Sequence, residues 1–89
     1  MIYNFRFTSK ADKQFSKLDK PIKHQILDYL EKNIEGTDNP RMFGKALQGD
    51  LNNYWRYRIG KYRLIAEIKD QELLVLGLAI GKRNDIYKR

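Results

Sequence analysis

The stretch from Tyr54 to Lys69 reads Tyr-Trp-Arg-Tyr-Arg-Ile-Gly-Lys-Tyr-Arg-Leu-Ile-Ala-Glu-Ile-Lys. On both sides of the central Gly60-Lys61, one set of alternate side chains is apolar and the other is largely charged. This alternation is typical of strands, whose successive side chains point to opposite faces of a sheet. A two-residue loop with glycine first favours a type II′ turn. The sequence therefore predicts a β-hairpin.

The loop length sets the register of this hairpin. Arg58 should lie directly opposite Arg63, with Arg56 opposite Ile65 on the same face. Like charges directly across a strand pair destabilise a sheet, so three guanidinium groups there suggest a bound anion. Arginine suits phosphate, because its planar fork gives bidentate contacts. The alternative is a solvated polar face on which Glu67 neutralises Arg56, and the hairpin alone leaves both interpretations open.

Length and composition limit the class of protein. We expect one domain over residues 1–89, because 89 residues with 42% hydrophobic content suit a single folded unit. The sequence has no cysteine, one histidine and no glycine-rich phosphate loop, so we expect no disulfide, metal or cofactor. No apolar run is long enough to cross a membrane and no signal peptide is expected, which favours a cytoplasmic protein.

The positive charge of the chain is unevenly distributed. The net charge is +7, and residues 54–89 carry nine Lys/Arg against four Asp/Glu. A basic C-terminal half indicates either nucleic acid or an acidic protein as partner.

The remaining segments predict an α+β fold. Residues 1–7 alternate as a strand, and Thr8 or Ser9 can cap a helix that continues to about Leu18. Apolar residues at helical spacing predict a second helix from about Pro21 to Ile34, which would pack antiparallel to the first.

The second half of the chain completes the predicted sheet. Residues 41–53 predict a short turn or helix, and residues 72–80 predict a central strand in which Gly77 marks a close approach or a bulge. We therefore expect an N-terminal strand, two antiparallel helices and a three-stranded antiparallel meander, which form a small four-stranded sheet followed by a short tail.

Arg83 and Tyr87 lie in that basic tail, four positions apart. Cleavage of RNA needs a base for the 2′-hydroxyl, cations for the charged transition state and an acid for the leaving oxygen. Tyrosine and arginine could supply these groups. The alternative is a basic tail that Tyr87 anchors to the core, and the residues alone favour this alternative.

Two segments resemble the RelE/ParE toxin superfamily of bacterial toxin–antitoxin systems. They are Leu47-Gln-Gly-Asp-Leu-Asn-Asn-Tyr-Trp-Arg-Tyr-Arg-Ile-Gly-Lys-Tyr-Arg-Leu-Ile and Ile80-Gly-Lys-Arg-Asn-Asp-Ile-Tyr. The similarity extends along the whole chain in the order of elements. It implies a small basic ribonuclease that cuts mRNA in the ribosomal A site by attack of the 2′-hydroxyl. It also implies that the toxin is a monomer when free and that a cognate antitoxin blocks it in a heteromeric complex.

The resemblance also implies roles for individual residues. Arg56 and Arg58 fall on substrate-binding positions. Arg63 falls on a catalytic position, Arg83 on that of the general acid and Tyr87 on that of the general base.

Two lysines depart from the superfamily pattern. Many relatives have Asp where this chain has Lys61, and His where it has Lys82. Both lysines add positive charge, and we expect them to contact the substrate.

The ParE branch shares the fold but inhibits DNA gyrase and does not cut RNA, so a non-catalytic gyrase toxin is the alternative function. The presence of both Arg83 and Tyr87 favours the nuclease.

Overall fold

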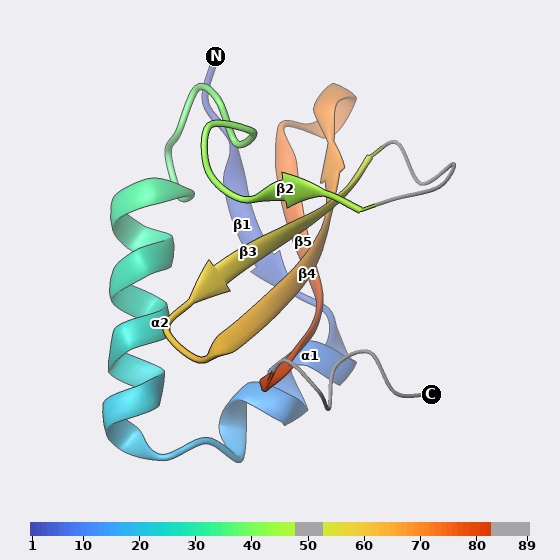
Figure 1. The fold of residues 1–89 in the computed structure, drawn as a ribbon. Coiled ribbons are helices and arrows are strands. Elements are labelled where there is room, and N and C mark those ends of the chain that lie inside the picture. The colour runs from blue at the N-terminus through green and yellow to red at the C-terminus, as the bar shows by residue number, and fades with distance from the viewer. Residues whose placement is uncertain (48–52, 83–89) are drawn as a thin grey trace.

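The structure of the protein, a computed structural model, describes residues 1–47 and 53–82. Within these ranges, five strands form one mixed sheet in the order β1-β5-β4-β3-β2, with two α-helices (Figure 1). Their bounds, in chain order, are β1 (Asn4–Phe7), α1 (Ser9–Ser16), α2 (Lys20–Asn33), β2 (Lys45–Ala46), β3 (Tyr54–Ile59), β4 (Tyr62–Lys69), the 3₁₀ turn η1 (Asp70–Glu72) and β5 (Leu74–Lys82).

The central hairpin of β3 and β4 confirms the predicted register. Arg58 pairs with Arg63, and Arg56 pairs with Ile65. Gly60 has a φ of +60°, whereas Lys61 keeps a negative φ, which is the pattern of a type II′ turn.

The prediction of a four-stranded sheet was wrong in two respects. Residues 45–46, expected to lie in a turn or helix, form the edge strand β2, which pairs antiparallel with β3. A two-residue strand is too short for alternation to reveal it. In addition, β1 pairs parallel with β5, so that Asn4 lies opposite Leu74. The long helical connection after β1 permits this arrangement, because parallel strands need such a crossover.

Both helices pack on one face of the sheet. Thr8 caps α1, since its Oγ1 accepts a hydrogen bond from the Ala11 amide at 3.1 Å. Further along α1, Phe15 stacks on Phe7 of β1, with ring centroids 5.2 Å apart. The side-chain oxygen of Gln14 accepts a hydrogen bond from the Ile80 amide at 2.8 Å, so α1 also satisfies part of the β5 backbone.

The two helices pack mainly on the sheet and little on each other. α1 packs mainly against β5 and α2 against β3, and Figure 1 shows the helices splayed apart from their short connection. Each helix therefore buries its apolar side against the sheet and not along the other helix.

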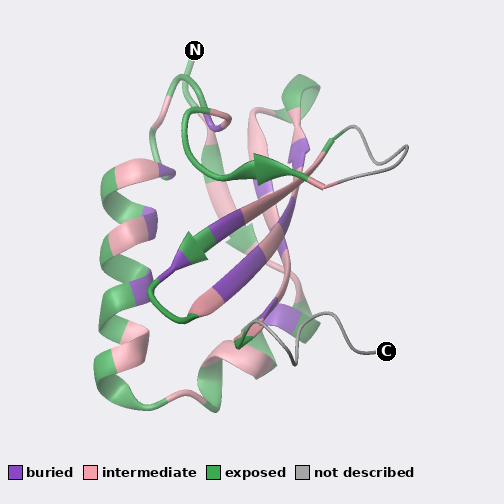
Figure 2. Ribbon diagram, in the orientation of Figure 1, coloured by how far each residue is buried: buried purple, intermediate pink, exposed green. Residues whose placement is uncertain are grey.

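The core lies between α2 and the sheet (Figure 2). Apolar residues of α2 meet the inward-facing residues of β3, β4 and β5, and burial of this surface is the main stabilising contribution to the fold. The buried members are Ile26, Leu30, Ile34, Tyr57, Ile59, Leu64, Ala66, Ile68, Val75 and Ile80.

Gly77 confirms both features predicted for it. A Cβ at this position would lie 2.9 Å from the Phe5 ring and 3.0 Å from the Phe7 ring, so the aromatic side chains of β1 need the glycine. The pairing of β4 with β5 also shifts here, because Ile65 pairs with Ala79 while the next residue, Ala66, pairs with Gly77. The resulting bulge leaves the β5 residue between Ala79 and Gly77 without an opposite partner.

Candidate anion-binding site

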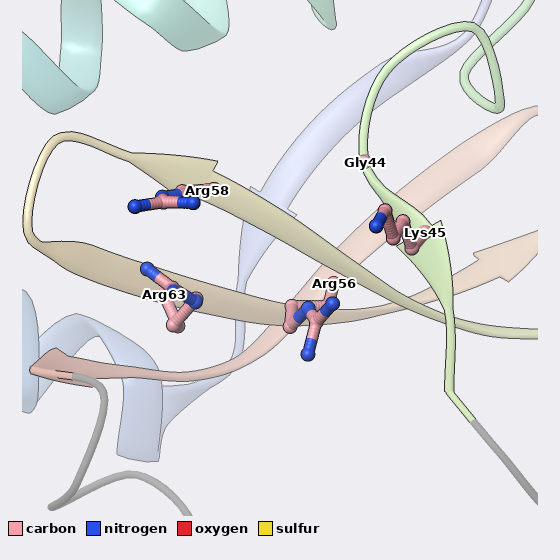
Figure 3. A pocket seen from close by; sticks show the side chains of 5 residues that line it. All are labelled: Gly44, Lys45, Arg56, Arg58 and Arg63. Carbon is pink, nitrogen blue, oxygen red and sulfur yellow. The ribbon is translucent and has the colours of Figure 1, made fainter.

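A pocket of about 250 Å³ opens on the sheet beside the hairpin (Figure 3). It is lined by Gly44, Lys45, Arg56, Arg58 and Arg63. The alternation of the strands places these side chains on the face opposite the helices, because Tyr57 and Leu64, their neighbours in sequence, are fully buried in the core. The structure thus brings together three arginines that the sequence predicted.

The four cations occur as two cross-strand pairs. Arg58 of β3 lies directly opposite Arg63 of β4, and Lys45 of β2 lies directly opposite Arg56 of β3. Figure 3 shows the first pair nearer the hairpin turn and the second nearer the sheet edge. Like charges directly opposite each other on neighbouring strands destabilise a sheet. No acidic side chain is among the described residues that line the pocket, so the lining favours an anionic ligand.

Arg63 is the most enclosed of these cations. It is 8% exposed and lies on β4, between β3 and β5. Its partner on β5 is Gly81, which has no side chain to cover the guanidinium group. By contrast, Arg58 is exposed. A ligand would therefore meet one enclosed arginine and one exposed arginine at the same pair.

Gly44 and Lys45 form one wall of the pocket, and this wall depends on an unusually close approach of the chain to β3. Gly44 has a φ of +79°, and a Cβ there would lie 2.3 Å from the carbonyl oxygen of Arg56. Nearby, the Trp55 indole Nε1 donates a hydrogen bond to the Phe43 carbonyl at 2.6 Å. Only glycine fits this position without displacing backbone, so Gly44 determines how near Lys45 comes to Arg56.

Two further contacts anchor the segment that precedes β2. The buried Tyr57 hydroxyl donates a hydrogen bond to the carbonyl of Pro40. Arg41 forms a bidentate ion pair with Asp70, at 2.9 and 3.0 Å, and its guanidinium group lies 5.9 Å from the centre of the Trp55 ring. The segment is thus held by β3 and by η1 before it reaches the pocket.

Asp70 is the centre of a small polar cluster. In addition to the bonds from Arg41, it accepts a hydrogen bond from the Tyr3 hydroxyl at 2.6 Å. The bonds from Arg41, and secondarily that from Tyr3, lower the pKa of the Asp70 carboxyl below its ordinary value. The cluster joins the N-terminal segment, the loop before β2 and η1.

Two other predicted site residues lie away from the pocket. Lys61 is exposed in the hairpin turn and Lys82 is exposed at the end of β5, and neither lines the pocket. Arg83 and Tyr87 lie outside the described residues. Lys45 is the site residue that the sequence did not predict, since the strand that positions it is too short to leave a pattern.

The proposed neutralisation of Arg56 by Glu67 is not observed. The ion pairs among the described residues do not join these two side chains. Glu67 instead lines a second cavity, together with Lys69 and three residues of η1, Asp70, Gln71 and Glu72.

Among described residues, no cluster of three or more His, Cys, Asp or Glu side chains could hold a metal ion. Neither helix of the described chain is long and apolar enough to span a membrane.

Comparison with known proteins identifies the family. Residues 5–87 match the family model described as the ParE toxin of the type II toxin–antitoxin system parDE. The chain is 32% identical to toxin RelG of Mycobacterium tuberculosis over the full length of both, and 29% identical to the mRNA interferase toxin RelE of Escherichia coli, covering 98% of this chain and 92% of RelE.

A solved structure is similar throughout. The toxin–antitoxin complex RelBE2 of Mycobacterium tuberculosis contains a chain with a TM-score of 0.78 and 28% identity, with coverage of 93% of this chain and 94% of that one. The family model spans nearly the whole domain, and the fold agrees with it. The chain therefore belongs to the ParE toxin family of type II toxin–antitoxin systems, within the RelE/ParE superfamily.

Proposed function

We propose that the protein is a RelE-type toxin that cleaves mRNA on the ribosome and so inhibits translation. The observation that carries this proposal is the pocket in which Lys45, Arg56, Arg58 and Arg63 converge from three strands. A phosphodiester is the anion best matched to several guanidinium groups, because each can donate two parallel hydrogen bonds to its oxygens. The relative that is named an mRNA interferase supports the same activity.

The proposed reaction is an in-line transesterification. The ribose 2′-oxygen attacks the adjacent phosphorus and loses its proton to a base, while the bond to the 5′-oxygen of the next nucleotide breaks. The products are a 2′,3′-cyclic phosphate and a 5′-hydroxyl, which receives a proton from an acid. Negative charge grows on the phosphoryl oxygens in the transition state, and fixed cations stabilise it.

The residues divide between these tasks. Arg63 would stabilise the transition state, since it is largely enclosed and needs little reorganisation when charge develops. Arg56 and Arg58 would bind the RNA backbone, with Lys61 and Lys82 as outlying substrate contacts. Tyr87 as base and Arg83 as acid remain proposals that rest on the resemblance.

The proposal includes a protein partner. A cognate antitoxin would bind the free, monomeric toxin in a heteromeric complex and block its activity, as the RelBE2 complex suggests by its similarity. An mRNA substrate also places the toxin in the cytoplasm, where translating ribosomes are found.

Primer extension on mRNA bound to translating ribosomes tests the nuclease. Wild-type toxin should produce discrete cuts. Arg63→Ala should lower the single-turnover rate by roughly 10²–10³-fold, as for removal of one donor to a developing oxyanion. Arg83→Ala and Tyr87→Phe should each lower it by at least ~10²-fold with nearly unchanged thermal stability. Lys13→Ala removes an exposed lysine on α1 and serves as the charge-matched control.

Intact mRNA at a toxin concentration that stops growth would reject the nuclease. If Tyr87→Phe cleaves like wild type, Tyr87 is an anchor and not the base.

The second candidate is a non-catalytic toxin that inhibits DNA gyrase. The observation in its favour is the match of residues 5–87 to the ParE family model. This candidate predicts inhibition of supercoiling by the purified toxin and a DNA-damage response in cells whose mRNA remains intact. It also predicts that Tyr87→Phe and Arg83→Ala keep full toxicity, which separates it from the nuclease.

A further inference from the structure

The two like-charged pairs of the pocket follow one another along β3. Arg56 and Arg58 are two residues apart on β3 and therefore project from the same face. Their separation along the strand is ~6.6 Å, twice the rise of about 3.3 Å per residue. Each has its cationic partner directly across, Lys45 for Arg56 and Arg63 for Arg58. The pocket thus contains two cation pairs one strand repeat apart.

This spacing matches a repeating anion better than a single one. Successive phosphates in an extended RNA strand are separated by roughly the same distance, because one sugar and its two ester linkages lie between them. The pocket volume of about 250 Å³ is also many times the ~10–15 Å³ that a cavity needs, in the same measure, to hold one water molecule, so there is room for more than one phosphate group.

The two pairs differ in their position on the sheet. The Arg58–Arg63 pair includes the enclosed arginine, and Arg63 faces Gly81 near the end of β5, two residues before the proposed Arg83 in sequence. The Lys45–Arg56 pair lies at the sheet edge, where the Gly44 wall closes the pocket. The first pair is therefore suited to the reacting phosphate and the second to a phosphate that takes no part in the chemistry.

We infer that the pocket binds two successive phosphates of one RNA strand, the scissile phosphate on Arg58–Arg63 and its neighbour on Lys45–Arg56. This inference rests on the proposed function and adds a second phosphate subsite to it. The second subsite sets the position of the strand, because it fixes the backbone on one side of the bond to be cut. Such positioning contributes to the rate without contact with the reacting atoms.

The test uses short ligands that cannot be cleaved. A 2′-deoxy trinucleotide has two phosphates, and the same trinucleotide with one uncharged methylphosphonate linkage has only one; both positional isomers of the modified ligand are used. Affinities are measured by titration with wild-type toxin and with a Lys45→Ala/Arg56→Ala variant. The charge-matched control is Lys10→Ala/Lys13→Ala, which removes two exposed lysines of α1, and thermal denaturation establishes that each variant is folded.

Two phosphate subsites predict a specific pattern. The double variant should weaken binding of the two-phosphate ligand by at least about tenfold and leave the better one-phosphate isomer nearly unchanged. For single strands, log K falls with log salt concentration by about 0.7 per phosphate contacted. The slope for the two-phosphate ligand should therefore change from about −1.4 in wild type to about −0.7 in the double variant.

Other outcomes overturn the inference. Equal losses for both ligands would mean that all four cations surround a single phosphate. Unchanged binding of both ligands, or no binding of either to wild type, would mean that no second phosphate is held at Lys45–Arg56. The proposed nuclease is judged separately by cleavage on ribosomes. If the wild-type toxin cuts mRNA but the double variant loses affinity equally for both ligands, only the second subsite is refuted. If the ligands show the predicted pattern but mRNA on ribosomes stays intact, only the nuclease is refuted.

Discussion

Replacing Gly44 with alanine perturbs the point at which the pocket wall meets β3. A left-handed backbone costs a non-glycine residue roughly 1–2 kcal/mol, and the smaller entropy of the unfolded alanine variant returns about 0.4–1 kcal/mol. The new Cβ would also lie 2.3 Å from the Arg56 carbonyl oxygen, so β2 must move away from β3.

That movement has a cost of its own. It would break at least the Trp55–Phe43 hydrogen bond and the bond from the Leu47 amide to the Tyr54 carbonyl. At about 0.5–1.5 kcal/mol each, these losses bring the expected destabilisation of Gly44→Ala to about 2–4 kcal/mol. For a domain of this size, 1 kcal/mol shifts Tm by about 4–8 °C, so a fall of roughly 10 °C or more is expected.

Gly36→Ala is the matched control. Its φ of +80° is nearly the same as that of Gly44, but no atom lies within 4 Å of the position that its Cβ would take. This variant should therefore show only the backbone cost, about 1 kcal/mol or less. Thermal denaturation of both variants, followed by circular dichroism, gives the difference. Ribosome-dependent cleavage, measured below both Tm values, should be lowered in Gly44→Ala and retained in Gly36→Ala. Equal Tm losses in the two variants would refute the close-approach argument.

Three further measurements test other parts of the structure. Tyr57→Phe leaves the Pro40 carbonyl without its buried donor and should cost about 1–3 kcal/mol, whereas Tyr62→Phe, whose hydroxyl has no hydrogen bond to the described residues, should cost much less. Asp70→Asn should lower stability at pH 7 by up to about 1 kcal/mol, because the Arg41–Asp70 pair is partly exposed. The pKa of Asp70 in the folded protein lies below its value of ~3.9 in the unfolded chain. The stabilisation that ionised Asp70 gives is therefore complete at pH values above ~3.9 and is lost as the pH falls through the folded pKa. Denaturation curves of wild type and Asp70→Asn should therefore converge in acid, and a constant difference would contradict the ion-pair explanation. Finally, association with the antitoxin should slow severalfold between about 50 and 500 mM salt, because the Debye length is only ~10 Å at 0.1 M and shortens further; stopped-flow rates that do not change with salt would indicate hydrophobic docking.

Local patterns predicted the hairpin and three of the pocket residues. Alternation continues over many residues around Gly60-Lys61, and the turn type restricts the register to one possibility. The pairing of Arg58 with Arg63 follows from these two constraints, because a one-residue slip would move Tyr57 and Leu64 out of the core.

Features that depend on distant contacts were not predictable in this way. β2 exists because Gly44 allows close approach and because the Tyr57 and Trp55 side chains hold the preceding loop, and neither reason is visible at residues 45–46 themselves. Lys45 was missed as a site residue for the same cause. Alternation in residues 1–7 indicated a strand but not its neighbour or direction, which the helical crossover and Gly77 determine.

The pairing of β1 with β5 has a consequence for the timing of folding. Asn4 and Leu74 are about 70 residues apart, and bringing such distant segments together costs about 4 kcal/mol in the length-dependent part of the closure entropy. During synthesis, β1 has no sheet partner until residues 74–77 have been made, so the early part of the chain must remain without its final sheet. Contacts this distant also slow folding relative to a helical domain of similar size. A newly made toxin therefore acquires its complete sheet late, which leaves an interval in which an antitoxin produced alongside it can be present before the sheet is complete.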